Sequence, residues 1–375
     1  MDQKEAGRGI RFSKPGLFFH NMKFTVFKLA GYSLLLFLII FLSRVLWPRN
    51  YDVPKFQKRP GTQYWDLSTG SRIGYTLVPA IVDRKDDPVI YLHGGPGGSI
   101  SETDISLLSP LSGDGYDIYF YDQVGSGQSN RLNNISEYTV ERHKKDLLEI
   151  VNLTGSDKVI LIGQSWGAIL AILFAAENPG KVAKIILTSP GPIYPIRKEL
   201  ITTKAPDSLH LRAPYYTNQQ GNMKANNLRT RAMAFFASNF SMKLANDEEA
   251  DDFSTYLNSE VNKSTLCDTA IMLKSTAGSG FYSRIMTYKS LTQMPDARSK
   301  IRDINIPVLV MKGQCDNQYW GYTNEYLELI KNSRLAFIPA AGHFISIEKP
   351  GLYVSTIREF LTTDQYNRSQ RAVRN

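Results

Sequence analysis

The stretch VILIGQSWGAILAILF, residues 159–174, decides the fold of this chain. Its first four residues are apolar, which is typical of a buried strand, and the apolar run after Gly167 is typical of a helix. Gly163 and Gly167 flank Ser165 in the pattern G-x-S-x-G, where a larger side chain would collide with the neighbouring strand or helix. The stretch therefore predicts a strand, a sharp turn and a helix, with the Ser165 hydroxyl exposed at the turn as a candidate nucleophile.

A serine hydroxyl needs a base to take its proton, and histidine has a pKa suited to that task near neutral pH. The chain has five histidines. His343 follows the apolar run 335–338 and a turn of small residues, which predicts a loop at the end of a late strand. We interpret His20, His143 and His210 as surface residues, because their neighbours are mostly polar or flank a membrane segment. His343 is therefore the candidate base, and its alternative is a structural histidine in the core.

The third catalytic residue should be a carboxylate that orients the imidazole and stabilises its charged form. Asp316 lies between Ser165 and His343 in the chain, after the buried-strand pattern 306–311 and a short turn. Asp303 precedes the same strand and would lie at the opposite edge of the sheet. Asp316 is therefore the candidate carboxylate, and its alternative is an ordinary turn-forming aspartate.

A glycine-rich segment, His93-Gly94-Gly95-Pro96-Gly97-Gly98, follows the apolar run 88–92. Glycines let the backbone approach a reacting group and direct N–H groups at an oxygen that becomes negative in the transition state. We expect the amides of Gly95 and Trp166 to form this oxyanion hole. A phosphate-binding loop is the alternative, but neither the Lys-Ser/Thr of a P-loop nor a G-x-G-x-x-G pattern is found.

These motifs resemble the prolyl aminopeptidase (proline iminopeptidase) family, which consists of serine peptidases with the α/β-hydrolase fold. The likeness is carried by residues 93–97, 122–129 (DQVGSGQS) and 163–168, with the candidate carboxylate and histidine in the expected order. It extends over residues 61–363. The resemblance implies a Ser-Asp-His hydrolase without a cofactor, which removes an N-terminal residue, preferably proline, from short peptides.

Two features differ from that family. Val124 stands where the second motif usually carries arginine, and the cap patterns whose glutamates bind the substrate amine are not found. The acidic run 247–252 could supply such carboxylates, but we interpret it as the start of a helix, where the helix dipole favours negative charge. The substrate-binding residues are therefore unknown. An esterase or amidase acting on small acyl substrates is the alternative, and a non-catalytic binding protein is the alternative from another class.

Strand-like runs alternate with helical patterns along most of the chain, which predicts a mostly parallel sheet with helices on both faces. The predicted strands are 71–78, 88–92, 116–121, 158–162, 182–188, 306–311 and 335–338. The predicted helices are 140–153, 166–177, 323–331 and 353–361. The alternation disappears after residue 191, which predicts an inserted helical cap whose aromatic residues either line the substrate pocket or form the cap's own core. The predicted organisation is a basic tail 1–23, a transmembrane anchor 24–47, a linker 48–60, a catalytic domain 61–191 and 298–363, a cap 192–297 and a polar tail 364–375.

Residues 29–43 are uncharged and rich in Leu, Ile and Phe, and their apolar flanks bring the segment to the roughly 20 residues that span a bilayer. A cleaved signal peptide is the alternative, but no small-x-small cleavage site follows. We therefore predict a retained single-pass anchor. A short basic tail usually stays cytoplasmic while a long following domain crosses the membrane, so the catalytic domain is predicted to be extracytoplasmic, either periplasmic or lumenal.

The net charge of +9 lies almost entirely in residues 1–60, which hold 11 basic and three acidic side chains. Because the rest of the chain is nearly neutral, no nucleic-acid partner is predicted. Cys267 and Cys315 are predicted to form neither a disulfide framework nor a metal site. The expected partners are a small peptide or acyl substrate and the membrane, with no metal or cofactor.

Overall fold

The structure is a computed structural model that describes residues 16–268, 270–271 and 276–363, without the side chains of residues 16–25. The predicted tails therefore lie largely outside the described residues. The chain divides into two compact units, Met1–Trp47 and Pro48–Asn375. In the first unit, helix α1 (Gly16–Leu46) contains a segment, Val26–Leu46, that is long and apolar enough to cross a membrane. A signal sequence would meet the same criterion of length and composition.

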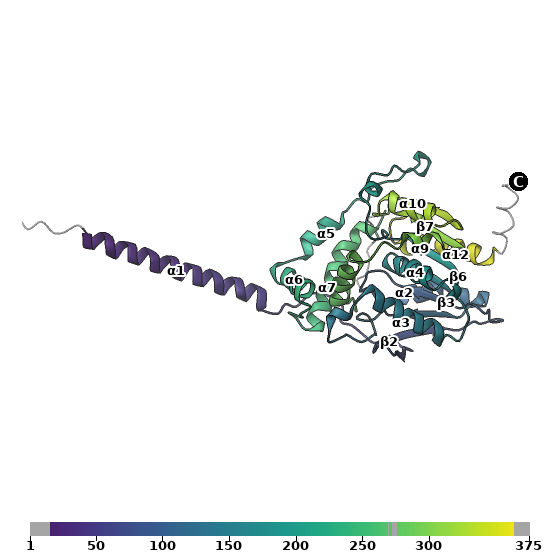
Figure 1. The fold of residues 1–375 in the computed structure, drawn as a ribbon, viewed down its shortest axis with the longest axis horizontal. Helices are drawn as coiled ribbons and strands as arrows, with labels where there is room; N and C mark the ends of the chain where they lie inside the picture. Colours follow the sequence, from purple (N-terminus) through teal and green to yellow (C-terminus); the bar gives the residue numbers. More distant parts are fainter. Residues whose placement is uncertain (1–15, 269, 272–275, 364–375) are drawn as a thin grey trace, which may run out of the picture. The chain divides into compact units, whose positions relative to one another are not determined.

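The second unit is built around one sheet of eight strands (Figure 1). Its strands are β1 (Gln63–Asp66), β2 (Arg72–Val78), β3 (Val89–Leu92), β4 (Ile118–Tyr121), β5 (Val159–Gln164), β6 (Val182–Thr188), β7 (Val308–Gly313) and β8 (Ser333–Ile338). Their order is β1-β2-β4-β3-β5-β6-β7-β8. Strands β3 to β8 run parallel, whereas β2 pairs antiparallel with both β1 and β4. The predicted α/β fold with a mostly parallel sheet is confirmed.

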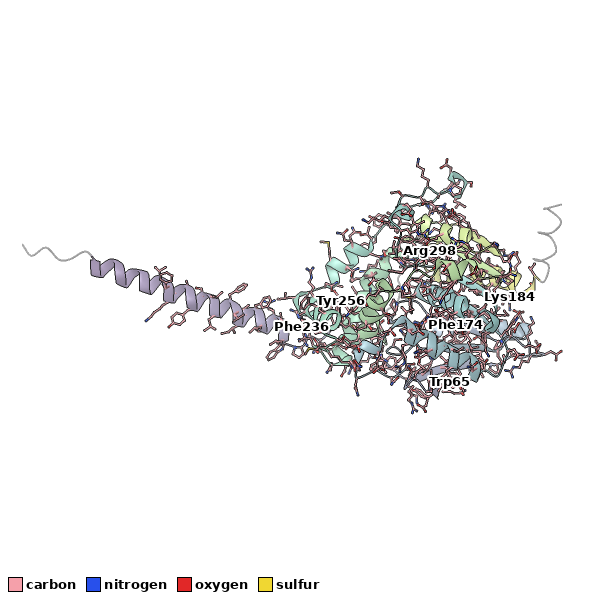
Figure 2. All side chains as sticks on the ribbon, in the orientation of Figure 1. Trp65, Phe174, Lys184, Phe236, Tyr256 and Arg298 are labelled. Atoms are coloured by element: carbon pink, nitrogen blue, oxygen red, sulfur yellow. A yellow bond between two sulfur atoms is a disulfide. The ribbon has the colours of Figure 1, made fainter. Side chains whose placement is uncertain are left out.

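Strand β1 was not predicted. It has only four residues, and none of them is fully buried. Its place at the sheet edge depends on pairing with β2, and Trp65 stacks on Tyr75 of that strand with ring centroids 3.5 Å apart. The labelled side chain of Trp65 can be followed in Figure 2.

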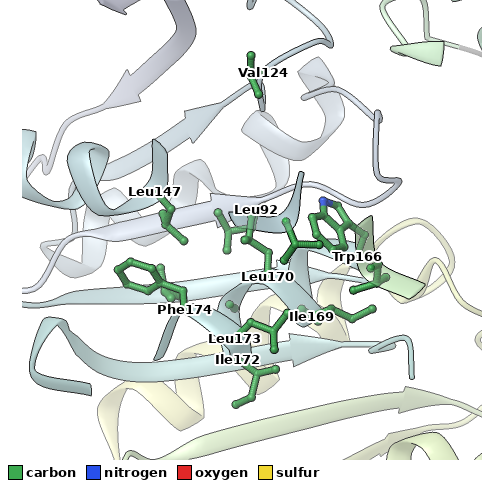
Figure 3. Packing of buried hydrophobic residues seen from close by; sticks show 14 of the residues in the cluster. Leu92, Val124, Leu147, Trp166, Ile169, Leu170, Ile172, Leu173 and Phe174 are labelled. Carbon is green, nitrogen blue, oxygen red and sulfur yellow. The ribbon is translucent and has the colours of Figure 1, made fainter. Parts of the chain in front are cut away.

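Helices cover both faces of the sheet because its strands are apolar on both sides. The helices are α2 (Glu102–Leu108), α3 (Val140–Leu153), α4 (Trp166–Glu177), α9 (Arg298–Arg302), α10 (Trp320–Leu329), α11 (Ile345–Glu348) and α12 (Pro350–Thr362). In β3, Ile90 and Leu92 join a buried cluster with α3, α4, α9 and α10. Val89 and Tyr91 join a second cluster with α2, α11 and α12 on the other face. Figure 3 shows the first cluster, in which the apolar side chains of α4 meet Leu92 and Leu147.

The segment between β6 and β7 carries the predominantly helical insertion. Its α-helices in the described residues are α5 (Asn218–Ala225), α6 (Leu228–Phe240), α7 (Asp247–Val261) and α8 (Phe281–Thr292). Helix α8 packs against α6 and α7 and also against α3 of the sheet-bearing part. The acidic run opens α7, where Asn246 accepts a hydrogen bond from the backbone of Glu249, so its interpretation as a helix start is confirmed.

The aromatic residues of the insertion fall into two groups. Phe253, Phe281 and Tyr282 are buried and contact one another, so they belong to the core of the insertion. Phe235 and Phe240 lie on α6 and are more than half exposed. None of these five side chains is therefore assigned to a substrate pocket.

Residues 48–60 belong to the second unit rather than connecting it loosely to the first. The Arg59 side chain is buried and forms an ion pair of 3.2 Å with Asp122. The same guanidinium donates to the hydroxyl of Thr76 at 2.9 Å and to the carbonyl of Ile100 at 3.0 Å. The next-to-last residue of the predicted linker, Arg59, is thus anchored to the 122–129 motif.

Candidate active site

The turn after β5 has the geometry that its glycines predict. Ser165 has φ +54° and ψ −111°, a backbone conformation that non-glycine residues rarely adopt, and α4 begins at the next residue. A Cβ added to Gly163 would lie 2.4 Å from the carbonyl oxygen of Gly167. A Cβ added to Gly167 would lie 2.0 Å from the carbonyl oxygen of Leu92. Both glycines are therefore required for the close approach of α4 to β3 and β5, and this approach holds Ser165 at the turn.

The predicted base and carboxylate lie together. His343 Nδ1 is 2.8 Å from Asp316 Oδ1, and these residues follow the carboxyl ends of the neighbouring strands β8 and β7. Although burial alone would raise the pKa of Asp316, the Lys312 ammonium at 3.1 Å and the adjacent His343 hold that pKa well below its usual range. An ionised Asp316 accepts a hydrogen bond from the Nδ1–H group of His343, which leaves Nε2 unprotonated and able to take a proton from a nucleophile.

Ser165, the third predicted catalytic residue, follows the carboxyl end of β5. Strand β5 is separated from β7 by β6 alone. Among the described residues, the Ser165 hydroxyl forms no hydrogen bond with His343. Hydrogen bonds of this kind are often formed only when substrate binds. The structure therefore joins Asp316 to His343 directly and places Ser165 at the same edge of the sheet.

The glycine-rich loop after β3 supplies the predicted oxyanion-hole residue Gly95. This residue is exposed and has φ +128°, and a Cβ added to it would lie 2.5 Å from the amide nitrogen of Gly98. Trp166 is the first residue of α4, so its N–H group has no acceptor within that helix. Within the described part of the chain, neither amide donates a hydrogen bond to another backbone group. In the described residues, neither predicted donor is therefore committed to a backbone acceptor.

A buried network joins the three motifs. Trp166 Nε1 donates to Gln123 Oε1 at 2.7 Å, and Gln123 Nε2 donates to the carbonyl of His93 at 3.0 Å. The backbone N–H of Gln123 donates to His93 Nε2 at 3.0 Å, so the ring carries its proton on Nδ1, which lies 2.8 Å from the carbonyl oxygen of Gly94. Burial lowers the pKa of His93, which keeps this ring neutral. The network joins the glycine-rich loop to the first residue of the helix that follows Ser165.

The interpretation of His143 as a surface residue is wrong. His143 is buried, its Nε2 lies 3.0 Å from the hydroxyl of Thr287, and its ring meets Trp166 edge-on at 5.7 Å between centroids. Burial lowers the pKa of His143 to about 3, so the ring is neutral and structural. The helical spacing from Val140 to Leu147, which places His143 on the same apolar face, was the signal that could have revealed this.

The prediction about the two cysteines is also wrong. Cys267 and Cys315 form a disulfide with Cα atoms 5.2 Å apart. They are separated by 48 residues, so no local spacing pattern indicated the pairing. Cys315 directly precedes Asp316, and the disulfide therefore connects the insertion to the loop that carries the candidate carboxylate. Among the described residues, no cluster of three or more His, Cys, Asp or Glu side chains is suited to a metal ion.

Arg284 is a residue near the site that sequence reasoning missed. It lies on α8, and a Cβ added to Gly97 would lie 3.1 Å from both its backbone nitrogen and its Cβ. One turn later, the Tyr288 hydroxyl lies 3.4 Å from the carbonyl oxygen of Gly95. Burial lowers the pKa of Arg284, and its guanidinium donates to Asn258 Oδ1 at 2.9 Å. No carboxylate pairs with Arg284 in the part of the chain that the structure describes.

Known proteins agree with this architecture. The sequence profile of the α/β-hydrolase fold matches residues 87–350. A putative 2-succinyl-6-hydroxy-2,4-cyclohexadiene-1-carboxylate synthase from Bacillus subtilis (strain 168) is 27% identical over 287 residues, which cover 75% of this chain and 92% of that protein. A proline iminopeptidase from Saccharolobus solfataricus is 26% identical over 280 residues, which cover 73% of this chain and 84% of that protein.

A solved structure of a proline iminopeptidase from Mycobacterium smegmatis superimposes with a TM-score of 0.53 at 17% identity, over 82% of this chain and 99% of that chain. The resemblance inferred from the motifs is confirmed at the level of the family. Because the profile covers more than half of the sequence, the chain belongs to the α/β-hydrolase fold family.

Proposed function

We propose that this protein is a serine hydrolase, and specifically an aminopeptidase that releases N-terminal proline or another small residue from short peptides. The proposal is carried by the hydrogen bond between His343 and Asp316 at the sheet edge where the strained turn presents Ser165. The names of the two proline iminopeptidases similar to this chain support the aminopeptidase activity.

In the proposed reaction, Ser165 Oγ attacks the carbonyl carbon of the scissile bond while His343 Nε2 takes the hydroxyl proton. The negative oxygen of the tetrahedral intermediate accepts hydrogen bonds from the amides of Gly95 and Trp166. His343 then gives the proton to the leaving amine, and an acyl-enzyme remains on Ser165. A water molecule, deprotonated by His343, hydrolyses that ester and restores the free serine.

The aminopeptidase assignment is tested with the full-length protein in detergent micelles. The substrates are a proline arylamide with a free amine, its N-acetylated form and the corresponding alanine arylamide. We expect the free-amine proline substrate to be hydrolysed fastest, because an aminopeptidase must recognise the charged amino group. Equal rates for the free and the acetylated forms would overturn the peptidase assignment while leaving the serine-hydrolase assignment in place.

A second candidate is an esterase or amidase whose small acyl substrate carries a carboxylate. Arg284 is the observation that favours it. Its backbone lies against Gly97 of the glycine-rich loop, burial lowers the pKa of its guanidinium, and a guanidinium attracts a carboxylate and repels an ammonium group. The Bacillus subtilis relative is named as the synthase of a carboxylate.

Two nitrophenyl esters of similar size, the butyrate and the hemisuccinate, separate the two candidates. If the second candidate is correct, Arg284→Met should lower kcat/KM for the hemisuccinate by about 10-fold or more, in line with a charge-assisted hydrogen bond. The butyrate should be hydrolysed at an unchanged rate, and Arg284→Lys should retain part of the preference. An equal loss for both esters would show that Arg284 is structural.

We also propose that α1 is retained as a single-pass anchor and that the catalytic unit lies outside the cytoplasm. The apolar segment Val26–Leu46 supports the anchor, and the disulfide supports an oxidising compartment. Carbonate extraction of membranes followed by protease protection tests both points. Release from the membrane of a chain that begins after residue 47 would indicate a cleaved signal peptide. Digestion of the catalytic unit only when the protease can reach the cytoplasmic side would show that this unit lies in the cytoplasm.

A further inference from the structure

A short part of the insertion lies directly on the loop that carries His343. The carbonyl of Thr265, at the end of the 3-10 helix Asn262–Thr265, accepts hydrogen bonds from the backbone N–H groups of His343 at 2.7 Å and Phe344 at 3.3 Å. A Cβ added to Gly342 would lie 2.2 Å from the same carbonyl oxygen, so only glycine allows this approach. The backbone of the candidate base is therefore fixed by the insertion and not by the sheet alone.

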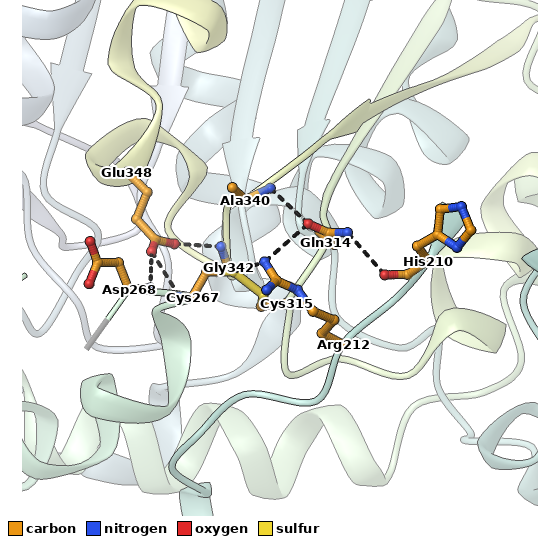
Figure 4. Close-up of a disulfide and its surroundings, with 9 residues drawn as sticks. All are labelled: His210, Arg212, Cys267, Asp268, Gln314, Cys315, Ala340, Gly342 and Glu348. Carbon is orange, nitrogen blue, oxygen red and sulfur yellow. Dashed lines mark hydrogen bonds between the residues drawn. A yellow bond between two sulfur atoms is a disulfide. The ribbon is translucent and has the colours of Figure 1, made fainter. Parts of the chain in front are cut away.

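Glu348 forms a second connection between the same two segments. Its Oε1 accepts from the backbone N–H groups of Cys267 and Asp268, each at 2.8 Å, and its Oε2 accepts from that of Gly342 (Figure 4). One carboxylate thus binds three amides, two from the insertion and one from the residue before His343. Removing it would leave these amides without their acceptor.

The disulfide forms the third connection. It joins Cys267, whose amide Glu348 binds, to Cys315, which directly precedes Asp316. The backbone N–H of Cys315 donates to the carbonyl of Ala341 at 2.8 Å, so the loops that carry Asp316 and His343 are also joined to each other. The Gln314 side chain accepts a hydrogen bond from the N–H of Ala340 and donates one to the carbonyl of His210, each at 3.0 Å, so it joins the His343 loop to the insertion near the disulfide (Figure 4).

We propose that Thr265, Glu348 and the Cys267–Cys315 disulfide, named here the histidine clamp, position His343 for proton transfer, so that catalysis depends on the oxidised cysteine pair. The clamp residues are positioning residues that act through His343, and the proposal rests on the proposed serine-hydrolase function. A displacement of about 1 Å at a catalytic group can cost on the order of 100-fold in rate. Loss of the covalent connection should therefore lower kcat more than it changes KM.

The redox step is an ordinary thiol–disulfide exchange. An external dithiol breaks the Cys267–Cys315 bond and supplies two electrons and two protons, which gives two cysteine thiols and the disulfide of the reagent. Oxidised glutathione reverses the step by accepting the same electrons and protons. The clamp can therefore be opened and closed in one protein sample without mutation.

The first experiment compares the full-length protein in detergent before and after reduction with dithiothreitol. Alkylation and intact mass confirm that both thiols are free. We expect kcat for nitrophenyl butyrate to fall by about 10-fold or more, with a smaller change in KM. Hydrogen exchange of the peptide covering residues 340–348 should rise, and reoxidation should restore both properties.

Variants separate positioning from folding. Cys267→Ser/Cys315→Ser should reproduce the reduced enzyme and should no longer respond to dithiothreitol. Glu348→Gln, which keeps the size of the side chain but has one acceptor oxygen fewer, should also lower kcat and raise exchange over residues 340–348. Glu359→Gln is the matched control, because that side chain is exposed on α12 and contacts only Arg334 among the described residues. Cooperative thermal unfolding of each variant shows that it is folded.

Unchanged kcat and unchanged exchange over residues 340–348, with both thiols demonstrably free, would overturn the clamp. Increased exchange with full kcat would also overturn it, since His343 would then not need these contacts. If the oxidised protein hydrolyses no ester and reacts with no fluorophosphonate, the proposed function fails. In that case, increased hydrogen exchange of residues 340–348 on reduction would still support the histidine clamp as the structure that holds the His343 loop. Unchanged hydrogen exchange there would overturn the clamp.

Discussion

The carboxyl edge of the sheet and the insertion between β6 and β7 differ in how their structure is encoded. At the sheet edge, each candidate residue lies within five residues of the end of a strand, so the turn at Ser165 and the loop at His343 can be read from contiguous sequence. The insertion meets that edge through single residues that are distant in sequence, such as Thr265 at His343 and Asp251 at Arg131. The type of reaction is therefore far easier to infer from this chain than the substrate.

The largest effect should come from removing the candidate nucleophile. Ser165→Ala should lower kcat for an ester by roughly 10⁴-fold or more, since no other group replaces the attacking oxygen. Steady-state kinetics on nitrophenyl butyrate measures the loss. Ser355→Ala, an exposed serine of α12, is the control, and substantial activity left in Ser165→Ala would place the chemistry elsewhere.

A change of the carboxylate should have a nearly equal effect. Asp316→Asn keeps the size of the side chain but favours the wrong tautomer of His343, so kcat should fall by about 10³-fold to 10⁴-fold with little change in KM. Asp303→Asn, at the other end of β7, should behave like the wild type because that side chain is exposed. Similar kinetics for both variants would contradict the assignment of Asp316.

The turn itself can be broken without touching a reacting group. Gly167→Ala places a methyl group about where the Leu92 carbonyl lies, and such overpacking costs about 1–3 kcal/mol. Differential scanning calorimetry should show a lower Tm together with reduced activity. Gly180→Ala is the matched control, because a Cβ there would meet no atom within 4 Å. A Tm for Gly167→Ala equal to that of the control would contradict the packing described here.

An effect on stability alone, without a change in the chemistry, is expected where the insertion meets the sheet-bearing part. Burial raises the pKa of Asp251 to about 6 despite its ion pair with Arg131. A carboxyl group with a pKa above its unfolded value of about 3.9 stabilises the fold below pH 4, and this contribution is lost as pH rises through 6. The stabilisation lost between pH 4 and pH 6 amounts to about 3 kcal/mol.

Asp251→Asn removes that titration. Thermal unfolding between pH 4 and pH 7 should therefore show the variant gaining stability relative to the wild type as pH rises. Asp207→Asn, on an exposed residue of the insertion, should follow the wild-type curve. Parallel curves for Asp251→Asn and the wild type would show that the buried carboxylate does not titrate in this range.

Local patterns predicted the elements that contain their own signals. The predicted helices 140–153 and 166–177 agree with α3 and α4 at both ends. Helix α3 is amphipathic and begins after the cap residue Thr139, whereas the almost wholly buried α4 begins at the Ser165 turn and ends before Asn178 and Pro179. The predicted strand 306–311 differs from β7 by two residues at both ends, and 335–338 differs from β8 by two residues at its start, since pairing with neighbours decides how far a strand extends.

The contacts that hold the candidate site depend on residues that are far apart. Nothing within several residues of Cys267 indicates that its amide meets Glu348, which lies 81 residues away beside the His343 loop. An even number of cysteines in a domain predicted to be extracytoplasmic was the one available signal for the disulfide. No sequence pattern indicated Arg284 as a candidate site residue. It stands out only in the structure, because no carboxylate pairs with its guanidinium among the described residues.

The central claim is that Ser165 is a nucleophile activated by His343. Reaction of the full-length protein with a fluorophosphonate, followed by tandem mass spectrometry, tests it directly, since the serine oxygen forms a bond to phosphorus as fluoride leaves. We expect one adduct, on Ser165, formed rapidly by the wild type and far more slowly by His343→Ala. No adduct in the wild type, or an adduct on another residue, would contradict it.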